Sequence, residues 1–429
     1  MMAYELNRAY FDSAAGDDWD IPESGNGVPD ILDEIKYELD WLLRMQDATD
    51  GWVANRVGVL SYNEAYPQLD NLQRYYTRGT TWATSSMAGL CAHGARLFAD
   101  FGTVYPDYDD LLTDRAELAW GWLATNPTMI PANGYDCGDQ NGDGTAAAPA
   151  KSDTGDDLRR RLFAAAELYK TTGNADYRDF FHANYDAPSI ADNGHRPIAS
   201  GSFDTSLSWI TQAAMIVYAS TAYTTDAGIV SAIKTSLQNG IEWNVVNNFN
   251  NGNDAYRAFM WDGHYCWGSN QLKAHWAFLP LAGIYLNVYP AHHTLYREIA
   301  EEYLHYFHGR NPVSIVYLTN MGTKGAALGA DYCVMEAYHG WFHNGSSLYD
   351  GASSSYGQAP GLMAGGPNRD FTWQDIIPPG GQPPQKAFKD WNAAWNISQG
   401  RNENSWEVTE PGIYYQAKYC TLIGYFCTP

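Results

Sequence analysis

The chain has 429 residues, of which 45% are apolar, and carries a formal net charge of −23 with a sequence pI of about 4.7. This length can form one large core or two ordinary domains. So acidic a surface repels nucleic acid and anionic membranes, and no apolar run is long enough to span a bilayer. We therefore expect neither as a partner, and instead a neutral substrate or a calcium ion.

Helical periodicity dominates the sequence from the N-terminus onward. Residues 1–6 are typical of the tail of a helix and do not form a signal peptide. Ile31, Ile35, Leu39 and Leu42 then lie on one face of a helix, with Pro29 at its start. Similar patterns predict helices over roughly 80–101, 110–125, 156–172, 205–223, 227–246, 271–288, 293–308 and 409–426. The predicted fold class is all-α, as one domain over residues 1–429, in an α/α barrel or a solenoid.

Loops rich in Gly, Asn, Asp and Pro separate these helices, at 127–155, 186–204, 247–270 and 310–405. The last of them is too long to be a simple connector, and long loops in compact domains are usually functional. Aromatic residues form 14% of the chain, with 16 Trp and 31 Tyr. Flat aromatic rings stack on the apolar faces of sugars, although large cores also use them.

Several other chemistries find no support in the sequence. The six cysteines form no CxxC pair and lack zinc-ligand spacing, so we expect one disulfide or none. Signatures of nucleotide-binding loops, zinc proteases and serine hydrolases are also missing. A nucleotide-dependent enzyme, a zinc protease and a serine hydrolase are therefore disfavoured.

Five stretches, in order along the whole chain, resemble glycoside hydrolase family 9, the family of many cellulases. They are IPESGNGVPDILDE at 21–34, AAAELYKTTG at 164–173, WGSN at 267–270, YFHGRNP at 306–312, and a discontinuous stretch made of PGLMAGGPN at 360–368, KDWN at 389–392 and SWEVTEPGIYYQA at 405–417. The first and last are long and specific. The resemblance implies an (α/α)6 barrel and hydrolysis of β-1,4-glucosidic bonds with inversion.

Glu410 is the residue that the resemblance identifies as the catalytic acid. Glycoside hydrolysis needs a carboxylic acid to protonate the leaving oxygen, and aromatic surroundings raise the pKa of a carboxyl group as that role requires. Trp406 and Tyr414 flank Glu410 in the sequence. Without the resemblance, the simpler interpretation of Glu410 is a carboxylate at the start of the last helix, where its negative charge complements the helix dipole. Glu407 is the nearest competitor for the acid.

The resemblance also implies a catalytic base, from an Asp-Ala-Gly-Asp motif upstream of residue 21. The 20 residues before that point contain no such motif. We therefore expect a barrel that is incomplete at the N-terminus, without its first helix and most of its second, and low activity of residues 1–429 alone. A similar stretch, YDCGD at 135–139, lies far from the expected place.

Residues 139–144 begin like a calcium-binding loop. Asp139, Asn141 and Asp143 have the D-x-N-x-D-G spacing, but Ala150 stands where the bidentate glutamate of an EF-hand belongs. A simple polar turn is one interpretation and a structural calcium site another. The reaction itself requires no cofactor.

The remaining site candidates are residues that would hold the sugar. The family has a His-x-Arg arrangement where this chain has His339 and Trp341, so the bidentate hydrogen bonds of the arginine are replaced by a stacking surface. Tyr415 matches a tyrosine near the cleaved bond. Trp261 and Trp267 are candidate stacking platforms, and core packing is the alternative for both.

The sequence therefore predicts a secreted glycosidase that binds and hydrolyses cellulose or a related β-glucan polysaccharide or oligosaccharide. Two alternatives stay open: an exo-acting β-glucosaminidase of the same fold, for which an acidic site would suit a cationic sugar, and a glycan-binding protein without catalysis.

Overall fold

The computed structural model describes residues 1–59, 71–132, 154–192, 194–203, 209–325, 328–330, 360–391, 397–398, 401–402 and 405–429. These residues form two compact units. Unit 1 comprises the described parts of Met1–Tyr62 and Leu72–Asn239, together with Cys427–Pro429, and unit 2 comprises mainly Gly240–Phe426. Both units are helical, as the periodicity of the sequence predicts.

Unit 1 contains nine of the described α-helices and one strand pair. The helices are α1 (Met2–Leu6), α2 (Arg8–Phe11), α3 (Asp30–Met45), α4 (Thr81–Phe98), α5 (Tyr108–Thr125), α6 (Thr154–Thr172), α7 (Ala175–Asn184), α8 (Trp209–Ala219) and α9 (Ala227–Gly240). Short 3-10 turns occur at Ala14–Gly16, Ala99–Phe101 and Pro188–Ile190. Strand β1 (Val57–Gly58) pairs antiparallel with β2 (Tyr75–Tyr76).

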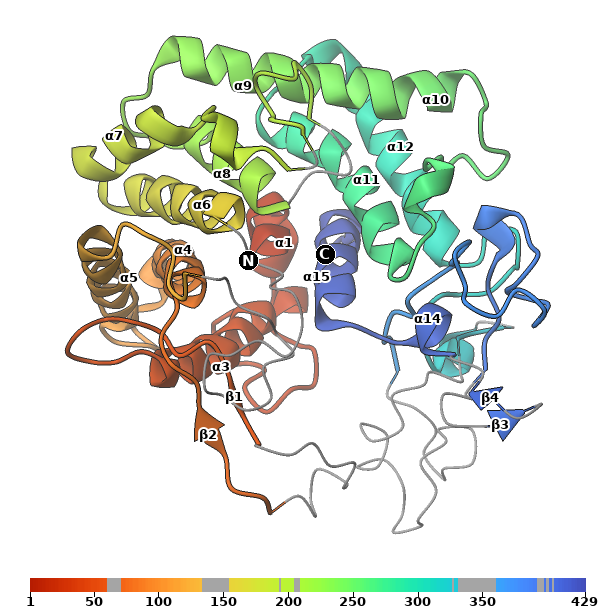
Figure 1. Cartoon of the computed structure of the whole chain (residues 1–429), viewed down its shortest axis with the longest axis horizontal. Helices are drawn as coiled ribbons and strands as arrows, with labels where there is room; N and C mark the ends of the chain where they lie inside the picture. Colours follow the sequence, from red (N-terminus) through yellow and green to blue (C-terminus); the bar gives the residue numbers. More distant parts are fainter. Residues whose placement is uncertain are drawn as a thin grey trace. The chain divides into compact units, whose positions relative to one another are not determined.

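Helices α4 and α6 form the centre of unit 1. Helix α4 packs against α5 and α6, and α6 in turn packs against α7 and α8, as neighbouring ribbons in Figure 1 show. The contact faces carry small residues, so that the helix axes can approach closely. Those that are fully or almost fully buried include Ala88, Ala92 and Ala95 of α4 and Ala164, Ala165 and Ala166 of α6.

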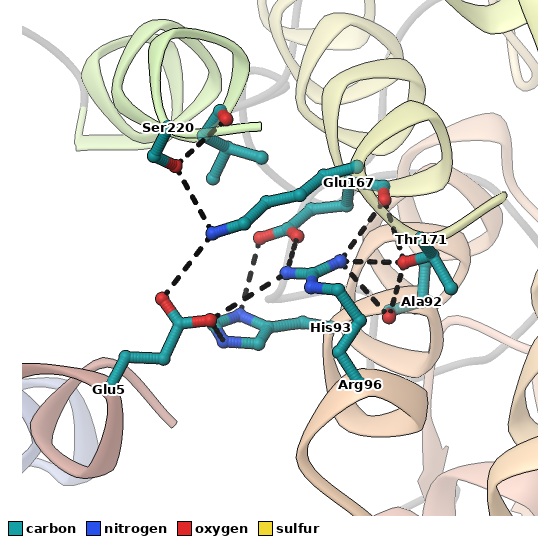
Figure 2. A network of polar contacts seen from close by, with 9 residues as sticks. Glu5, Ala92, His93, Arg96, Glu167, Thr171 and Ser220 are labelled. Atoms are coloured by element: carbon teal, nitrogen blue, oxygen red, sulfur yellow. Dashed lines mark hydrogen bonds and ion pairs between the residues drawn. The ribbon is translucent and has the colours of Figure 1, made fainter. Parts of the chain in front are cut away.

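A buried cluster of charged side chains joins α1 to α4 and α6 (Figure 2). The His93 imidazole lies 3.3 Å from Glu5 and 3.2 Å from Glu167, and the Arg96 guanidinium lies 2.5 Å from Glu167. Lys170 lies 3.6 Å from Glu5. Because both carboxylates are removed from water, each depends on these cations to remain ionised. The cluster therefore ties the short N-terminal helix to the centre of unit 1.

Unit 2 is built around α11. Its elements are a π-helical turn (Ile241–Val246), α10 (Asn247–Asn250), α11 (Ser269–Tyr285), α12 (His293–Phe307), α14 (Trp406–Thr409) and α15 (Ile413–Phe426), with 3-10 turns at Asp262–His264, Pro290–His292, Met321–Lys324 and Pro384–Lys386. Strands β3 (Ile397–Ser398) and β4 (Arg401–Asn402) pair antiparallel. Helix α11 packs against both α12 and α15.

The end of the chain differs from the expectation in one respect that matters for the site. The periodicity suggested one helix from 409 to 426, with Glu410 at its start. Instead, α14 ends at Thr409, Glu410 has an extended backbone (φ −61°, ψ 121°), and α15 begins at Ile413. The cause is Pro411, because a residue that precedes proline is disfavoured in the helical region. Glu410 is therefore in a linker between two helices.

Two further features bear on the expectations. None of the helices in the described ranges is both long and apolar enough to cross a membrane. Of the six cysteines, the structure describes Cys91, Cys266, Cys420 and Cys427, and all four are free thiols.

Candidate active site

Glu410 is held in place by the short helix that precedes it. Within α14, Glu407 is buried and accepts hydrogen bonds from the side-chain amide of Asn368 (3.1 Å), the backbone N–H of Thr372 (2.9 Å) and the Thr372 hydroxyl. With this many donors, the Glu407 carboxylate fixes α14 to the 368–372 turn. Since its oxygens are used in these bonds, Glu407 is a poor candidate for a proton donor to substrate.

The segment 360–368 anchors the other side of Glu410. The Gly366 N–H donates to the carbonyl of Val408 (2.8 Å), and Asn270, at the start of α11, binds the same segment with its backbone N–H on Gly365 and its side chain on Ala364. These contacts connect three stretches that are far apart in the sequence. They position the linker that carries Glu410 against the beginning of α11.

Gln416 of α15 completes this clamp. Its side-chain oxygen accepts from the Met363 N–H and its nitrogen donates to the Gly361 carbonyl, both at 2.9 Å. Sequence reasoning did not identify Gln416, Asn270 or Asn368 as positioning residues. All three lie within the stretches that carry the family resemblance. The sequence could therefore have indicated their role only through that resemblance.

The Glu410 carboxyl group is partly buried and has one described donor. The indole Nε1–H of Trp267, two residues before the start of α11, donates to Glu410 Oε2 at 3.0 Å. Burial raises the pKa of Glu410 above its ordinary value, and the hydrogen bond from Trp267, which favours the charged form, opposes part of that rise. A carboxyl group with a raised pKa keeps its proton to higher pH, as a general acid must.

Trp267 and Tyr415 lie close enough to this carboxyl group to interact with it, and Tyr414 packs on Tyr415. Trp267 is 50% exposed and Tyr414 58% exposed. Tyr415 is buried, its ring packs edge-on against Tyr414 at 4.5 Å, and the two hydroxyls lie 3.4 Å apart. The structure therefore brings together Glu410, Trp267 and Tyr415, three of the residues expected from the sequence.

Trp261 is the other candidate stacking platform, and it belongs to the same unit. It is 44% exposed and stands edge-on to Phe259 (4.9 Å) and Trp276 (6.4 Å). The buried Lys273 of α11 holds this stretch, because its ammonium donates to the Ala258 carbonyl (2.6 Å) and the Tyr265 hydroxyl (2.7 Å). No contact in the described part of the chain joins Trp261 to Glu410, so its role as a stacking platform stays a prediction.

Other candidates fall outside the described residues. His339 and Trp341 do, and so do Asp136 and the calcium candidates Asp139, Asn141 and Asp143. Within the ranges that are described, no group of three or more His, Cys, Asp or Glu side chains is arranged to hold a metal ion. The calcium site stays a prediction.

A partly buried carboxyl group bonded to an exposed indole, on an all-α scaffold, is compatible with the class of glycosidases. The sequence profile of Glycosyl hydrolase family 9 matches residues 1–423, and the chain belongs to that family.

Relatives of this chain include several endoglucanases. The chain is 26% identical to Endoglucanase C of Cellulomonas fimi (93% of this chain, 34% of the relative) and 29% identical to a xyloglucan-specific endo-beta-1,4-glucanase of Bacteroides ovatus (71% and 49%). It is 34% identical to Endoglucanase D of Acetivibrio thermocellus over 38% of this chain and 24% of the relative. The chain thus spans half or less of the length of each of these relatives.

A solved structure of the family 9 endoglucanase J30 superposes with a TM-score of 0.74 at 25% identity, covering 100% of this chain and 70% of that one. This likeness, with the family match, confirms the predicted fold class: all-α, of the (α/α)6 barrel type.

Proposed function

We propose that residues 1–429 act as one catalytic domain that hydrolyses β-1,4-glucosidic bonds of cellulose or a related β-glucan with inversion. Glu410 is the general acid. The observation that carries the proposal is the environment of Glu410: a partly buried carboxyl with a raised pKa, bonded to an exposed indole, in a family of glycoside hydrolases. The endoglucanase names of the relatives support the substrate class.

In this reaction the protonated Glu410 donates its proton to the glycosidic oxygen as the bond to C1 breaks. Trp267 holds Oε2 through its N–H, so the second oxygen is left to carry the proton. Water attacks the opposite face of the sugar, and a second carboxylate, standing about 6.5–9.5 Å away in inverting enzymes, takes a proton from it. The chemistry needs no cofactor.

Trp267 and Tyr414 offer ring surface on which a glucose unit can stack beside the acid. Tyr415, His339 and Trp341 complete the proposed sugar-binding set, on the strength of the family resemblance. Since polymeric glucans are found outside the cell, we also propose that the protein is secreted.

The test compares two neighbouring glutamates. Made in a version of the protein that carries the family's Asp-Ala-Gly-Asp motif, Glu410→Gln keeps the shape of the side chain but carries no acidic proton. We therefore expect kcat on soluble β-1,4-glucan to fall by about 10²–10⁴-fold while KM and the melting temperature stay nearly unchanged. Glu407→Gln is the matched control. It removes an acceptor from a buried set of donors, so we expect it to lower stability by about 1–3 kcal/mol.

Near-normal turnover of the Glu410→Gln protein would contradict the assignment and point to Glu407. The same assay run on glucosamine oligosaccharides separates the main proposal from the exo-β-glucosaminidase alternative. Glucan binding without turnover, in the version that carries the Asp-Ala-Gly-Asp motif and an unmodified Glu410, would instead favour a binding function.

A further inference from the structure

Lys273, in the second turn of α11, is a buried lysine that forms no ion pair with a carboxylate of the described residues. Its side chain is 1% exposed. Burial lowers the pKa of Lys273 to about 7, and the charge of Asp254 opposes part of that fall. An ammonium taken out of water without a counter-ion costs free energy that an apolar side chain of similar size would not. Stability alone therefore does not account for a lysine at this position.

Two hydrogen bonds and one aromatic ring hold the Lys273 ammonium. It donates to the Ala258 carbonyl (2.6 Å) and to the Tyr265 hydroxyl (2.7 Å), and it lies 4.1 Å from the centre of the Tyr306 ring. Ala258 and Tyr265 are the two ends of the segment 258–265, which precedes α11 in the chain. Because hydrogen bonds from a charged donor are strong, this one side chain ties both ends of the segment to α11.

Tyr265 is the residue at which this segment meets the support of the candidate acid. It is 3% exposed, and its carbonyl accepts from the backbone N–H of Arg369 (2.8 Å). Arg369 belongs to the 368–372 turn, which binds Glu407. Since α11 binds the side chain of Tyr265 and the turn binds its backbone, Tyr265 gives the residues that follow it a fixed starting point.

Trp267 follows Tyr265 by two residues and depends on that backbone for its position. Its side chain is 50% exposed, and its indole N–H is the described donor to Glu410 (3.0 Å). A half-exposed ring makes few buried contacts, so the backbone that carries it decides where it lies. The next residue is confined as well, because a Cβ at Gly268 would lie 2.6 Å from the Tyr415 hydroxyl. A shift at Tyr265 would therefore be passed on to the indole and to its bond with the carboxyl group.

We propose that Lys273 is a positioning residue for the candidate acid. Through Tyr265 it fixes the backbone that carries Trp267, and the indole N–H is thereby directed at Glu410. The meaning of this anchor for catalysis rests on the proposed function, in which Glu410 is the acid. Because proton transfer depends steeply on the placement of the reacting groups, loss of the anchor slows the reaction more than it weakens substrate binding.

The first measurement follows the indole itself and needs no turnover. In the proton–nitrogen NMR spectrum of the tryptophan-labelled protein, the indole resonance of Trp267 is identified by its absence from Trp267→Phe, and Glu410→Ala shows where it lies without its acceptor. Lys273→Met keeps the length of the side chain and removes its donors, whereas Tyr265→Phe removes only the hydroxyl that the lysine binds. We expect both variants to move the resonance toward its position in Glu410→Ala. If Lys273→Met does not fold, Tyr265→Phe decides.

Tyr303→Phe is the matched control for this measurement. The buried Tyr303 hydroxyl donates to the carbonyl of Phe259, in the same segment, so the variant removes a comparable bond that does not involve Tyr265. We expect the Trp267 resonance to stay in place in this variant, even where the melting temperature falls.

The second measurement is the pH profile of kcat/KM on a short cello-oligosaccharide; both use the version of the protein that carries the Asp-Ala-Gly-Asp motif. We expect Lys273→Met to lower kcat by about tenfold or more, with a much smaller change in KM. It should also move the alkaline limb to higher pH, because ionised Glu410 loses its donor. Added to Trp267→Phe, it should move the limb no further, since the indole through which the lysine acts is then absent.

A Trp267 resonance that stays in place in Lys273→Met and Tyr265→Phe would overturn the proposal. An equal displacement in Tyr303→Phe would overturn it too, in favour of a general loosening of the segment. So would a further movement of the limb in the double variant, because the lysine would then act by another route. A resonance that depends on Lys273, in a protein whose Glu410→Gln variant turns over normally, would leave the anchor standing while refuting the proposed function.

Discussion

Glu407 and Glu410 are three residues apart, and their surroundings give them different roles. Glu407 is buried and accepts hydrogen bonds from Asn368 and Thr372, whereas Glu410 has the Trp267 indole as its described donor. The sequence could not separate them on physical grounds, because both are glutamates near a helix end. The pairing of Glu410 with Trp267 spans 143 positions, a contact that no local pattern predicts.

Trp267→Phe tests the effect of that pairing on the acid. Phenylalanine keeps an aromatic ring but donates no hydrogen bond. Since the bond favours ionised Glu410, its loss should raise the pKa of Glu410 further. We expect the alkaline limb of the pH profile of kcat/KM to move to higher pH, because the ionised form loses its hydrogen-bond donor. An unmoved limb would show that the indole does not influence the reactive carboxyl.

At the scale of elements, long periodic patterns predicted the helices well. The pattern at 156–172 corresponds to α6 (Thr154–Thr172), and that at 293–308 to α12 (His293–Phe307). Helix α7 (Ala175–Asn184) was missed, because it is short and only Tyr177 and Phe181 mark its buried side. The pattern at 227–246 gave one helix, whereas α9 ends at Gly240 and a π-helical turn follows, a local change in winding that hydrophobic periodicity does not encode.

The segment 360–368 offers a paired test of how the linker is positioned. Gly361 and Gly366 both have positive φ (84° and 99°). A Cβ at Gly361 would meet no atom within 4 Å, but one at Gly366 would lie 2.5 Å from Asn270 Cγ. Gly361→Ala should therefore cost only the left-handed backbone strain, about 1–2 kcal/mol.

Gly366→Ala should cost about 1–3 kcal/mol more than Gly361→Ala, because Asn270 must move. It should also lower kcat, since Gly366 holds the Val408 carbonyl next to Glu410. Urea unfolding and kcat measured on both variants check this expectation. Equal losses in the two proteins would mean that Asn270 is free to move and does not fix the linker.

At the scale of the whole molecule, stability combines a strongly negative surface with a buried charge cluster in unit 1. Burial alone would lower the pKa of His93, but Glu167 and Glu5 together raise it above its ordinary value. Burial would raise the pKa of Glu5, but His93, Lys170 and Arg96 hold it well below its usual range. The two shifts make stability depend on pH in opposite directions.

The contribution of His93 to folding stability is complete below about pH 6.5, its pKa in the unfolded chain. It is lost as pH rises through the raised pKa of the folded state. The contribution of Glu5 to folding stability is complete above about pH 4.3, the pKa of an unperturbed glutamate. It is lost as pH falls through the lowered pKa of the folded state. We therefore expect stability of unit 1 to decline on both sides of mildly acidic pH.

His93→Gln should lower the unfolding free energy at pH 6 by about 3–5 kcal/mol and remove the alkaline decline that His93 causes. Asp100→Asn, which breaks the exposed pair with Arg8, is the control and should change it by less than about 1 kcal/mol. Urea titrations between pH 4 and 9 measure both. A His93→Gln protein with the same pH dependence as its parent would rule out the cluster as the cause.

The hydrogen bond between Trp267 and Glu410 has an optical consequence. The fluorescence of an indole responds to a charge placed next to its ring, so ionisation of Glu410 should change the emission of Trp267. The difference between the spectra of the parent and Trp267→Phe isolates this one indole among the 16 tryptophans. Recorded against pH, that difference reports the protonation of the acid with no sugar present, so that the resting enzyme can be titrated by light alone.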